Sequence, residues 1–240
     1  GAGMLARAAA VGIAAAGGDA LTHTLDSPVQ GAGAAARFGL PVSLIVEETG
    51  GTIYLHFFDE HGLPLGRTRE RKLEHALLQG EVSRARGDKV GRLRRLDFSL
   101  ESWAKWTVET CALRRPALRR LTAAVGTATP EDRCLRAALS ALGCRLEEAW
   151  RPGIPAFQAQ RGGFILTAQD EQGAIVDPGQ LLALTALIEM ENGCGKVAVP
   201  AGASAAVELV AAGYGGSVLR LDRDGDPASE LYAVQPWLRQ

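Results

Sequence analysis

Three consecutive polar residues, Glu47, Glu48 and Thr49, follow a continuous apolar run and precede Gly50 and Gly51. Carboxylates can exchange protons, and a threonine hydroxyl can carry a phosphoryl group. Neighbouring residues on a strand point to opposite faces, so the two glutamates cannot both address one substrate. Phosphoryl transfer also needs positive charge around the transferring group, which two adjacent carboxylates oppose. These residues therefore predict a loop with exposed carboxylates.

A nucleotide-binding pattern, G-x-G-x-x-A, occurs at Gly31, Gly33 and Ala36. Such glycines could cradle a pyrophosphate if they followed a strand and opened a helix. Here Pro28 places the helix start before the glycines, and no acidic residue stands at the end of a second strand. We interpret the pattern as a chance match in alanine-rich sequence.

The four cysteines form no C-x-x-C pair and have no histidine at metal-ligand spacing, which indicates free thiols in a reducing compartment. Two histidines, His56 and His61, bracket Asp59 and Glu60. They lie on opposite sides of an expected boundary between strand and turn, so we do not expect a metal site there.

Composition and charge are those of an ordinary globular protein, with 240 residues, 47% hydrophobic and 22% charged residues, and a formal net charge of −1. The apolar start, residues 4–16, is interrupted by Arg7 and is too short for a membrane span or a signal peptide. Residues 67–120 carry 15 basic and 7 acidic residues. They lack interleaved stacking aromatics, so we expect a solvated face and no binding of nucleic acid. We expect a cytoplasmic protein with no membrane partner.

Strands and helices are expected to alternate along the chain, because apolar runs alternate with amphipathic stretches and with turns rich in glycine or proline. Helices are predicted over residues 4–16, 28–38, 67–78, 100–111, 130–142, 180–190 and 204–212. Strands are predicted over residues 19–25, 42–46, 52–58, 90–96, 118–125, 145–150, 164–169, 196–199 and 217–221. This order predicts an α/β fold with mixed or parallel sheets flanked by helices.

Several segments, taken in order, resemble the α-D-phosphohexomutase family, whose members include phosphoglucomutases and phosphomannomutases. The opening M-L-A-R-A-A-A-V-G-I-A-A-A-G is similar to the family's first long helix, and Ser27 with Pro28 takes the place of its T-P. The stretch F-F-D-E-H-G-L-P-L from Phe57 resembles the strand and turn after its active-site loop. Leu166 begins L-T-A-Q-D-E-Q-G-A-I-V-D-P-G-Q-L-L-A-L, which is similar to the opening of its third domain.

This resemblance implies consecutive phosphohexomutase-like α/β units, of which the second is shortened and the third truncated. The implied divisions are residues 1–106, 107–173 and 174–240. The fourth, phosphate-binding domain of the family has no room on this chain.

The family's functional loops are changed at the matching positions. Where the family has T-A-S-H-N-P with a phosphorylated serine, this chain has Val46, Glu47, Glu48, Thr49 and two glycines. Where the family has D-G-D-A-D-R, whose aspartates hold Mg²⁺, this chain reads A-Q-R-G-G, with Gln160 and Arg161 as the counterparts. The resemblance therefore implies Mg²⁺ as the cofactor, but its aspartate ligands are absent, and we expect no catalytic, cofactor-binding or metal-binding residue and no cofactor.

We expect a catalytically degenerate member with a binding or scaffold role related to sugar phosphates. The alternative is an active sugar-phosphate mutase, an intramolecular phosphotransferase with a rearranged site. The expected partners are a sugar phosphate and a protein, and the protein partner could be a second copy of the chain, because shortened sheets leave apolar edges uncovered.

Overall fold

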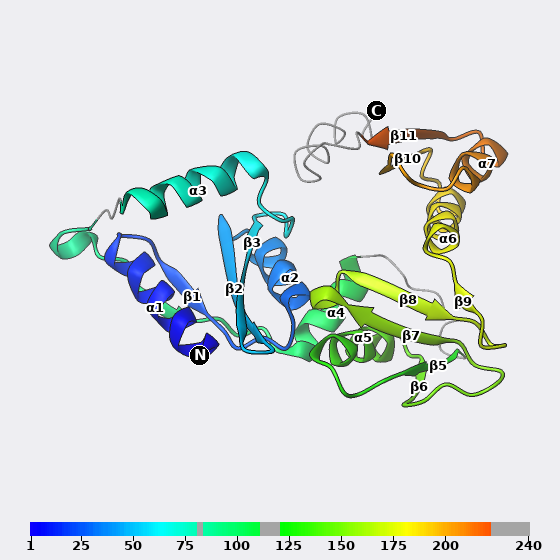
Figure 1. The fold of residues 1–240 in the computed structure, drawn as a ribbon, viewed down its shortest axis with the longest axis horizontal. Helices are drawn as coiled ribbons and strands as arrows, with labels where there is room; N and C mark the ends of the chain where they lie inside the picture. Colours follow the sequence, from blue (N-terminus) through cyan, green and yellow to red (C-terminus); the bar gives the residue numbers. More distant parts are fainter. Residues whose placement is uncertain (81–83, 111–120, 222–240) are drawn as a thin grey trace. The chain divides into compact units, whose positions relative to one another are not determined.

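The computed structural model describes residues 1–80, 84–110 and 121–221 (Figure 1). The chain divides into two compact units, Gly1–Gly173 and Ala174–Gln240. Among the helices of the described residues, none has both the length and the apolar character that crossing a membrane requires.

The first unit alternates helices and strands from its beginning to its end. Its elements are α1 (Ala2–Ala15), β1 (Ala20–Thr22), α2 (Pro28–Phe38), β2 (Val42–Thr49), β3 (Thr52–Asp59), α3 (Arg67–Gln79), the 3₁₀ turn η1 (Gly87–Lys89), β4 (Leu93–Arg95), α4 (Leu100–Thr110), β5 (Thr122–Val125), α5 (Pro130–Ala141), β6 (Arg145–Glu147), β7 (Ala156–Gln160), the 3₁₀ turn η3 (Arg161–Gly163) and β8 (Ile165–Gln169).

Helix boundaries in this unit follow local chemistry. Helix α2 starts at Pro28, whose fixed φ suits the first turn, and ends at Gly39 in the left-handed conformation that glycine adopts without strain. Helix α5 starts after Thr129, whose side-chain oxygen accepts a hydrogen bond from the backbone N–H of Asp132. Both ends of α2 and the start of α5 match the sequence-based boundaries to within one residue.

The strands of the first unit form three separate groups. Strand β1 pairs in parallel with β4, so Ala20 lies opposite Leu93 across a long sequence separation. Strands β2 and β3 form an antiparallel hairpin. Strands β6, β5, β7 and β8 lie side by side in that order; β5 runs parallel to β6 and β7, and β7 runs antiparallel to β8. The sheets are therefore mixed, as expected.

The core of the first unit sits on both sides of helix α2. One cluster of buried residues joins α2 to α4 and α5 through Ala34, Trp103 and Cys134. A second cluster joins α2 to the hairpin through Ala35, Ile45 and Phe58. Because small alanines dominate α2, other elements can approach it closely from two directions.

Glycines in α2 make these close approaches possible. A Cβ on Gly33 would lie 2.6 Å from Nε1 of Trp103, and a Cβ on Gly31 would lie 2.4 Å from Cδ1 of Ile45. The G-x-G-x-x-A pattern thus lies within a packed helix, where its glycines accommodate neighbouring side chains.

The second unit is smaller and repeats the α/β alternation. Its described elements are β9 (Ile175–Val176), α6 (Pro178–Glu191), β10 (Lys196–Pro200), α7 (Ala206–Gly213) and β11 (Ser217–Leu221). Strands β10 and β11 pair in parallel, and Ala186, Val199 and Val207 form its buried cluster. Asp177 caps α6 in a reciprocal capping box with Gln180.

The predicted fold class is confirmed: α/β, with mixed sheets flanked by helices. Three points need correction. Residues 156–160 form strand β7 and residues 175–176 form strand β9, neither of which was predicted, and β2 extends to Thr49 instead of ending before a loop. Part of the predicted strand 118–125 lies outside the described residues, and the division into three domains stays a prediction.

Candidate functional site

The hairpin of β2 and β3 occupies the position at which an active-site loop was expected. Strand β2 runs through Glu47, Glu48 and Thr49, and Thr49 lies directly opposite Thr52. Gly50 and Gly51 alone form the turn, with φ of 59° and 79°, the conformation that two-residue hairpin turns require. The predicted loop is therefore wrong, because cross-strand pairing continues to the turn, whereas Glu48 is exposed as predicted.

The two glutamates lie on opposite faces of this hairpin, as strand geometry requires. Oε2 of Glu47 lies 2.8 Å from Nε2 of His56, on the neighbouring strand. Glu48 accepts a hydrogen bond from the backbone N–H of Ala2 at 3.1 Å, and this bond lowers the pKa of its carboxyl. Both carboxylates are thus held by intramolecular contacts and do not converge on a common point.

Thr49 lies close to one of these carboxylates. Its Oγ1 is 3.5 Å from Oε1 of Glu47, at the limit for a hydrogen bond. A phosphoryl group on this hydroxyl would add negative charge next to an existing negative charge. A phosphoryl group on Thr49 would therefore be repelled by the Glu47 carboxylate.

The second pair of predicted positions lies at the end of β7. Gln160 is the last residue of that strand, and its Nε2 donates to Oε1 of Gln158 at 3.4 Å. Arg161 follows with φ of 49°. Among the described residues, all others with a positive φ are glycines. A non-glycine residue in this region costs about 1–2 kcal/mol, so neighbouring contacts must hold the turn.

Helix α2 supplies those contacts. Oγ of Ser27 donates a buried hydrogen bond of 2.7 Å to the carbonyl oxygen of Gly162. A Cβ on Gly162 would lie 3.0 Å from the ring of Pro28, and a Cβ on Gly163 would lie 2.5 Å from the side chain of Val29. The turn η3 is therefore packed against the first turn of α2, and Arg161 stands exposed on a fixed backbone.

Two carboxylates that were not predicted complete this junction, Asp132 on α5 and Asp26 just before α2. Asp132, 4% exposed, accepts from the backbone N–H of Ala159 at 3.2 Å. Asp26, just before α2, binds Arg133 of α5, with Nη2 at 3.1 Å and Nε at 3.2 Å. Asp132 could have been identified from the sequence, because it lies in the first turn of a capped helix, where carboxylates are favoured. The pairing of Asp26 with Arg133 could not, because it depends on tertiary structure.

The structure does not join the two sets of predicted positions. Among the described residues, no hydrogen bond or ion pair links Glu47, Glu48 or Thr49 with Gln160 or Arg161. The hairpin and the region of η3 meet instead through the rings of Phe58 and Phe164, whose centroids are 5.6 Å apart.

The residues at η3 do not fit Mg²⁺. This ion prefers oxygen ligands in an octahedral arrangement, and carboxylates are its usual protein ligands. Gln160 offers one amide oxygen, and Arg161 places a permanent positive charge beside it. Within the described part of the chain, no three or more His, Cys, Asp or Glu side chains gather as a metal site would require.

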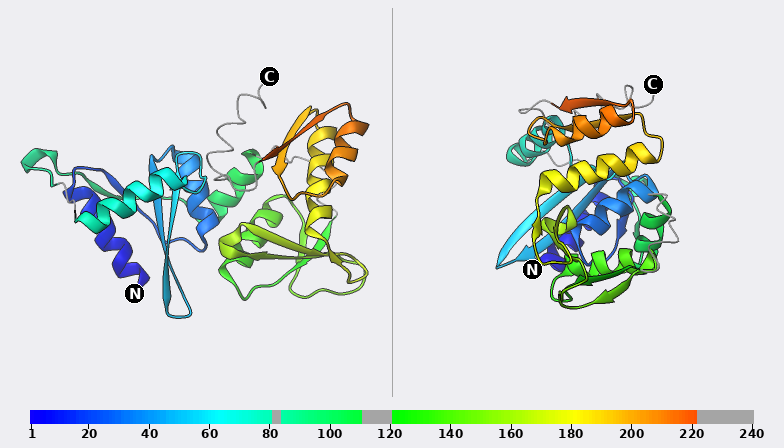
Figure 2. Two further views of the ribbon diagram at one scale, coloured as in Figure 1. Left: turned by 45° about the horizontal axis from the view of Figure 1, so that its top comes forward. Right: turned by 90° about the vertical axis from the view of Figure 1, so that its right-hand side faces the viewer.

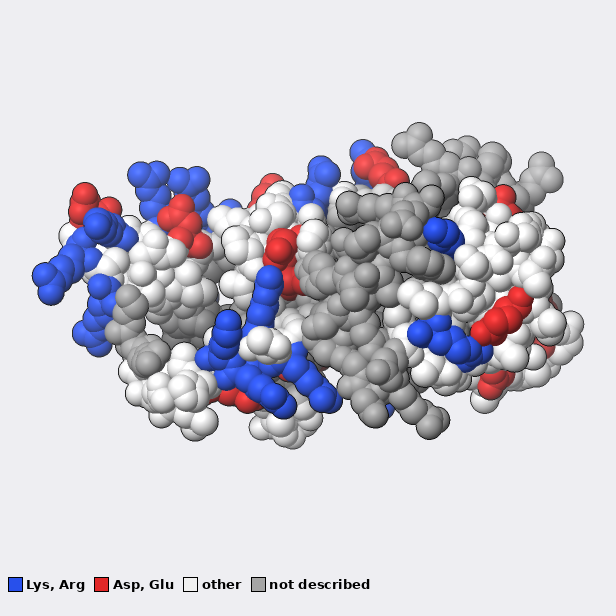
Figure 3. All heavy atoms as spheres, turned by 90° about the horizontal axis from the view of Figure 1, so that it is seen from above, with Lys and Arg blue, Asp and Glu red and all other residues white. Residues whose placement is uncertain are grey.

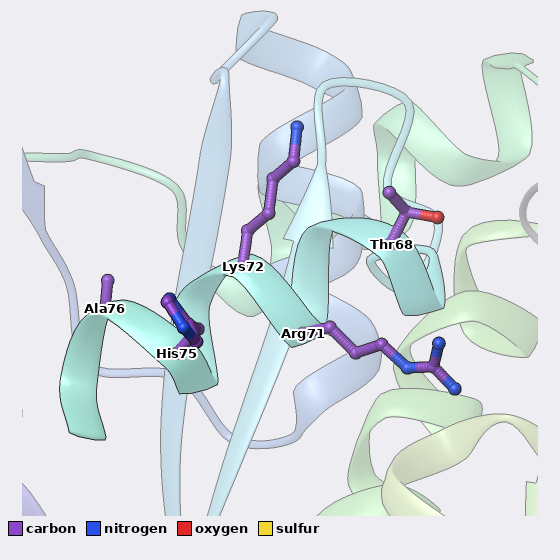
Figure 4. Close-up of a pocket in the computed structure, with 5 residues that line it drawn as sticks. All are labelled: Thr68, Arg71, Lys72, His75 and Ala76. Atoms are coloured by element: carbon purple, nitrogen blue, oxygen red, sulfur yellow. The ribbon is translucent and has the colours of Figure 1, made fainter. Parts of the chain in front are cut away.

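Charged side chains of both signs mix on the surface of the first unit. Arg69 binds Glu60 at 3.6 Å, and Figure 3 shows lysines and arginines standing beside acidic residues on the face it views. An open hollow of about 580 Å³ lies along α3, lined by Thr68, Arg71, Lys72, His75 and Ala76. Arg71 and Lys72 point away from each other there (Figure 4), so their charges do not converge on one ligand.

Comparisons with known proteins bear on the fold. No protein-family model matches the chain, and no curated protein sequence matches it significantly. A solved structure of a phosphoglucomutase/phosphomannomutase family protein from Burkholderia thailandensis is similar, with a TM-score of 0.70 and 16% identity over 98% of this chain and 58% of that one. A protein from Thermus thermophilus, provisionally assigned as a phosphomannomutase, is similar over 90% of this chain and 57% of its own, with a TM-score of 0.63 and 16% identity.

The chain thus spans less than two thirds of the length of either structure. At this identity the likeness concerns the fold and not the activity. The order of elements, the mixed sheets and these two structures together lead to one conclusion: the chain has a phosphohexomutase-like α/β fold.

Proposed function

We propose that this protein is a catalytically degenerate phosphohexomutase-like protein that binds a sugar phosphate without transferring its phosphoryl group. The observation that carries the proposal is the tight hairpin of β2 and β3. Its turn consists of Gly50 and Gly51, and the neighbouring Glu47 and Glu48 are held by contacts within the chain. The turn therefore offers no side chain that could accept or pass on a phosphoryl group.

Electrostatics supports the absence of transfer. Two unit charges about 4 Å apart repel by about 4 kcal/mol near a protein surface. A phosphoryl group on Thr49 would meet the Glu47 carboxylate at a comparable separation. Such repulsion raises the energy of a phosphorylated intermediate, which a mutase must form in every cycle.

Arg161 supports the binding half of the proposal. Its guanidinium is exposed, it pairs with no acidic side chain of the described residues, and its backbone is fixed through Ser27 and Gly162. Arginine binds phosphate through two parallel N–H donors, and a fixed backbone lowers the entropy lost on binding. We assign the phosphate of the ligand to this side chain.

A thermal-shift scan tests the proposal with glucose, mannose and glucosamine phosphates, each with and without Mg²⁺. A ligand at 100 times its dissociation constant adds about 2.7 kcal/mol of stability. We expect a shift that does not need Mg²⁺ and that is lost in Arg161→Asn, because asparagine tolerates the left-handed backbone but lacks the guanidinium. The matched control Arg145→Asn, at an exposed arginine of β6, should keep the shift.

Two results would count against the proposal. A shift that requires Mg²⁺, together with turnover in a coupled mutase assay, would favour the alternative, an active mutase with a rearranged site. No shift with any of the three sugar phosphates would remove the binding role.

A further inference from the structure

Strand β3 has an open edge along most of its length. On one side it pairs with β2 from Thr52 to Asp59. On the other side only its end is covered: the N–H of Asp59 donates to the carbonyl of Leu63 at 2.8 Å, and the N–H of Leu65 donates to the carbonyl of Phe57 at 3.1 Å. Within the described part of the chain, the edge is therefore uncovered from Thr52 to His56.

The hairpin register shows which backbone groups face this edge. A two-residue turn closes on a hydrogen-bonded pair, here Thr49 and Thr52, so alternate residues from Thr52 onward bond to β2. Ile53 and Leu55 therefore direct their N–H and C=O groups outward, in the same direction as the outward-facing groups of Phe57. Among the described residues, none supplies a hydrogen bond to these four groups.

The composition of the strand favours pairing. Residues 52–58 read T-I-Y-L-H-F-F, which is rich in β-branched and aromatic residues and contains no proline, lysine or acidic residue. Natural edge strands are usually protected from pairing by proline, by charged residues or by a bulge. This segment instead has the composition of strands that add to other strands.

Near the turn, β2 is contacted through the bond from Ala2 to Glu48, but the first half of β3 has no comparable support among the described residues. Helix α2 packs on Ile45 and Phe58, well back from the turn, and the side chains of residues 52–55 are exposed. Figure 2 shows the turn extending beyond α2. A two-stranded hairpin is only marginally stable in water, so additional strands would stabilise this part.

We propose that the open edge of β3 pairs with β3 of a second copy of this chain, antiparallel and about a twofold axis at Tyr54. In this register Ile53 lies opposite Leu55 of the second copy, and both direct their backbone groups toward the partner. Two such pairs form four hydrogen bonds and join the hairpins into a four-stranded sheet.

The edge is complementary to itself in this register. Tyr54 lies opposite its own counterpart in a non-hydrogen-bonded pair, where side chains are closest and aromatic pairs stabilise. Thr52 lies opposite His56, and no like charges face each other. Because a twofold interface uses the same patch on both copies, such self-complementarity favours a second copy over an unrelated strand.

Sedimentation equilibrium over a wide range of protein concentration tests the pairing. The unaltered chain should dimerise, and Tyr54→Lys and Tyr54→Glu should each weaken the dimer about tenfold, because like charges replace an aromatic pair at the axis. An equimolar mixture of the two variants should restore a dimer that contains one copy of each. A chain that stays monomeric throughout, or a mixture that does not associate, would overturn the proposal.

Disulfide formation provides a second test that does not depend on affinity. Opposed residues of a non-hydrogen-bonded pair have Cβ atoms close enough for a disulfide, so Tyr54→Cys should form a linked dimer on mild oxidation. The control is Leu78→Cys on α3, because Leu78 is 86% exposed but lies off the proposed interface. Equal linkage in both variants would contradict pairing through β3. Arg161 takes no part in this interface, so the pairing stands or falls separately from sugar-phosphate binding.

Discussion

Replacement of Gly33 by alanine should have two opposite effects on stability, a gain in helix propensity and a loss from steric overlap with Trp103. Gly33 lies inside α2, where alanine is favoured over glycine by about 1 kcal/mol. The added Cβ, however, would lie 2.6 Å from Nε1 and 2.8 Å from Cδ1 of Trp103, and 3.1 Å from Trp106. Distances below 3.0 Å cannot persist, so either the ring or the helix must move.

The ring of Trp103 has little freedom to move. The residue is 6% exposed and belongs to the buried cluster that joins α2, α4 and α5. Overpacking of a well-packed core costs about 1–3 kcal/mol. After the gain in propensity is subtracted, Gly33→Ala should lower the free energy of unfolding of the first unit by up to about 2 kcal/mol.

Urea unfolding followed by tryptophan fluorescence measures this change, because Trp103 and Trp106 lie at the altered contact. Gly12→Ala is the matched control, since Gly12 is also inside a helix and has no atom within 4 Å of an added Cβ. That variant should gain about 1 kcal/mol. If Gly33→Ala were as stabilising as Gly12→Ala, the packing described around Trp103 would be wrong.

Three further predictions concern single contacts. Ser27→Ala should lower the free energy of unfolding by about 1–3 kcal/mol in urea titration, because the buried Gly162 carbonyl loses its donor; an unchanged midpoint would contradict the contact. Burial raises the pKa of the Cys134 thiol to about 12, so iodoacetamide near neutral pH should label it in the unfolded but not the folded protein, as peptide mass spectrometry would show. A bidentate bond from Arg220 lowers the pKa of Glu208 below its ordinary 4.5, so the stability it contributes is present above that pH and lost as the pH falls through the lowered pKa. Circular dichroism melts across acidic pH should show this loss in the unaltered chain, and a similar pH dependence in Arg220→Met would contradict it.

Helix positions could be predicted well because their signals are local. Pro28 and Gly39 delimit α2, and Thr129 with Pro130 begins α5. Strand β7 was missed because A-F-Q-A-Q contains one strong strand former, and pairing with β5 and β8 holds it in place. Strand β7 therefore forms because of its tertiary pairing and not because of its local β-propensity.

The site was less predictable for the same reason. The sequence around Glu47 and Glu48 has the polarity of a loop, but the cross-strand register extends the hairpin to its glycine turn. The bond between Ser27 and Gly162 joins residues far apart in the sequence, and no local pattern indicates it. What could be predicted was that the two glutamates would not act together, because that follows from strand geometry alone.

The parallel pairing of β1 with β4 has a consequence for the order of folding. The hairpin of β2 and β3 closes over two residues and can form within microseconds, whereas β1 must wait for a partner encoded beyond residue 90. Pulse-labelled hydrogen exchange should therefore detect protection in the hairpin before protection at Ala20–Thr22. On the ribosome, β1 would stay unpaired until β4 has been synthesised, after both strands of the hairpin have emerged.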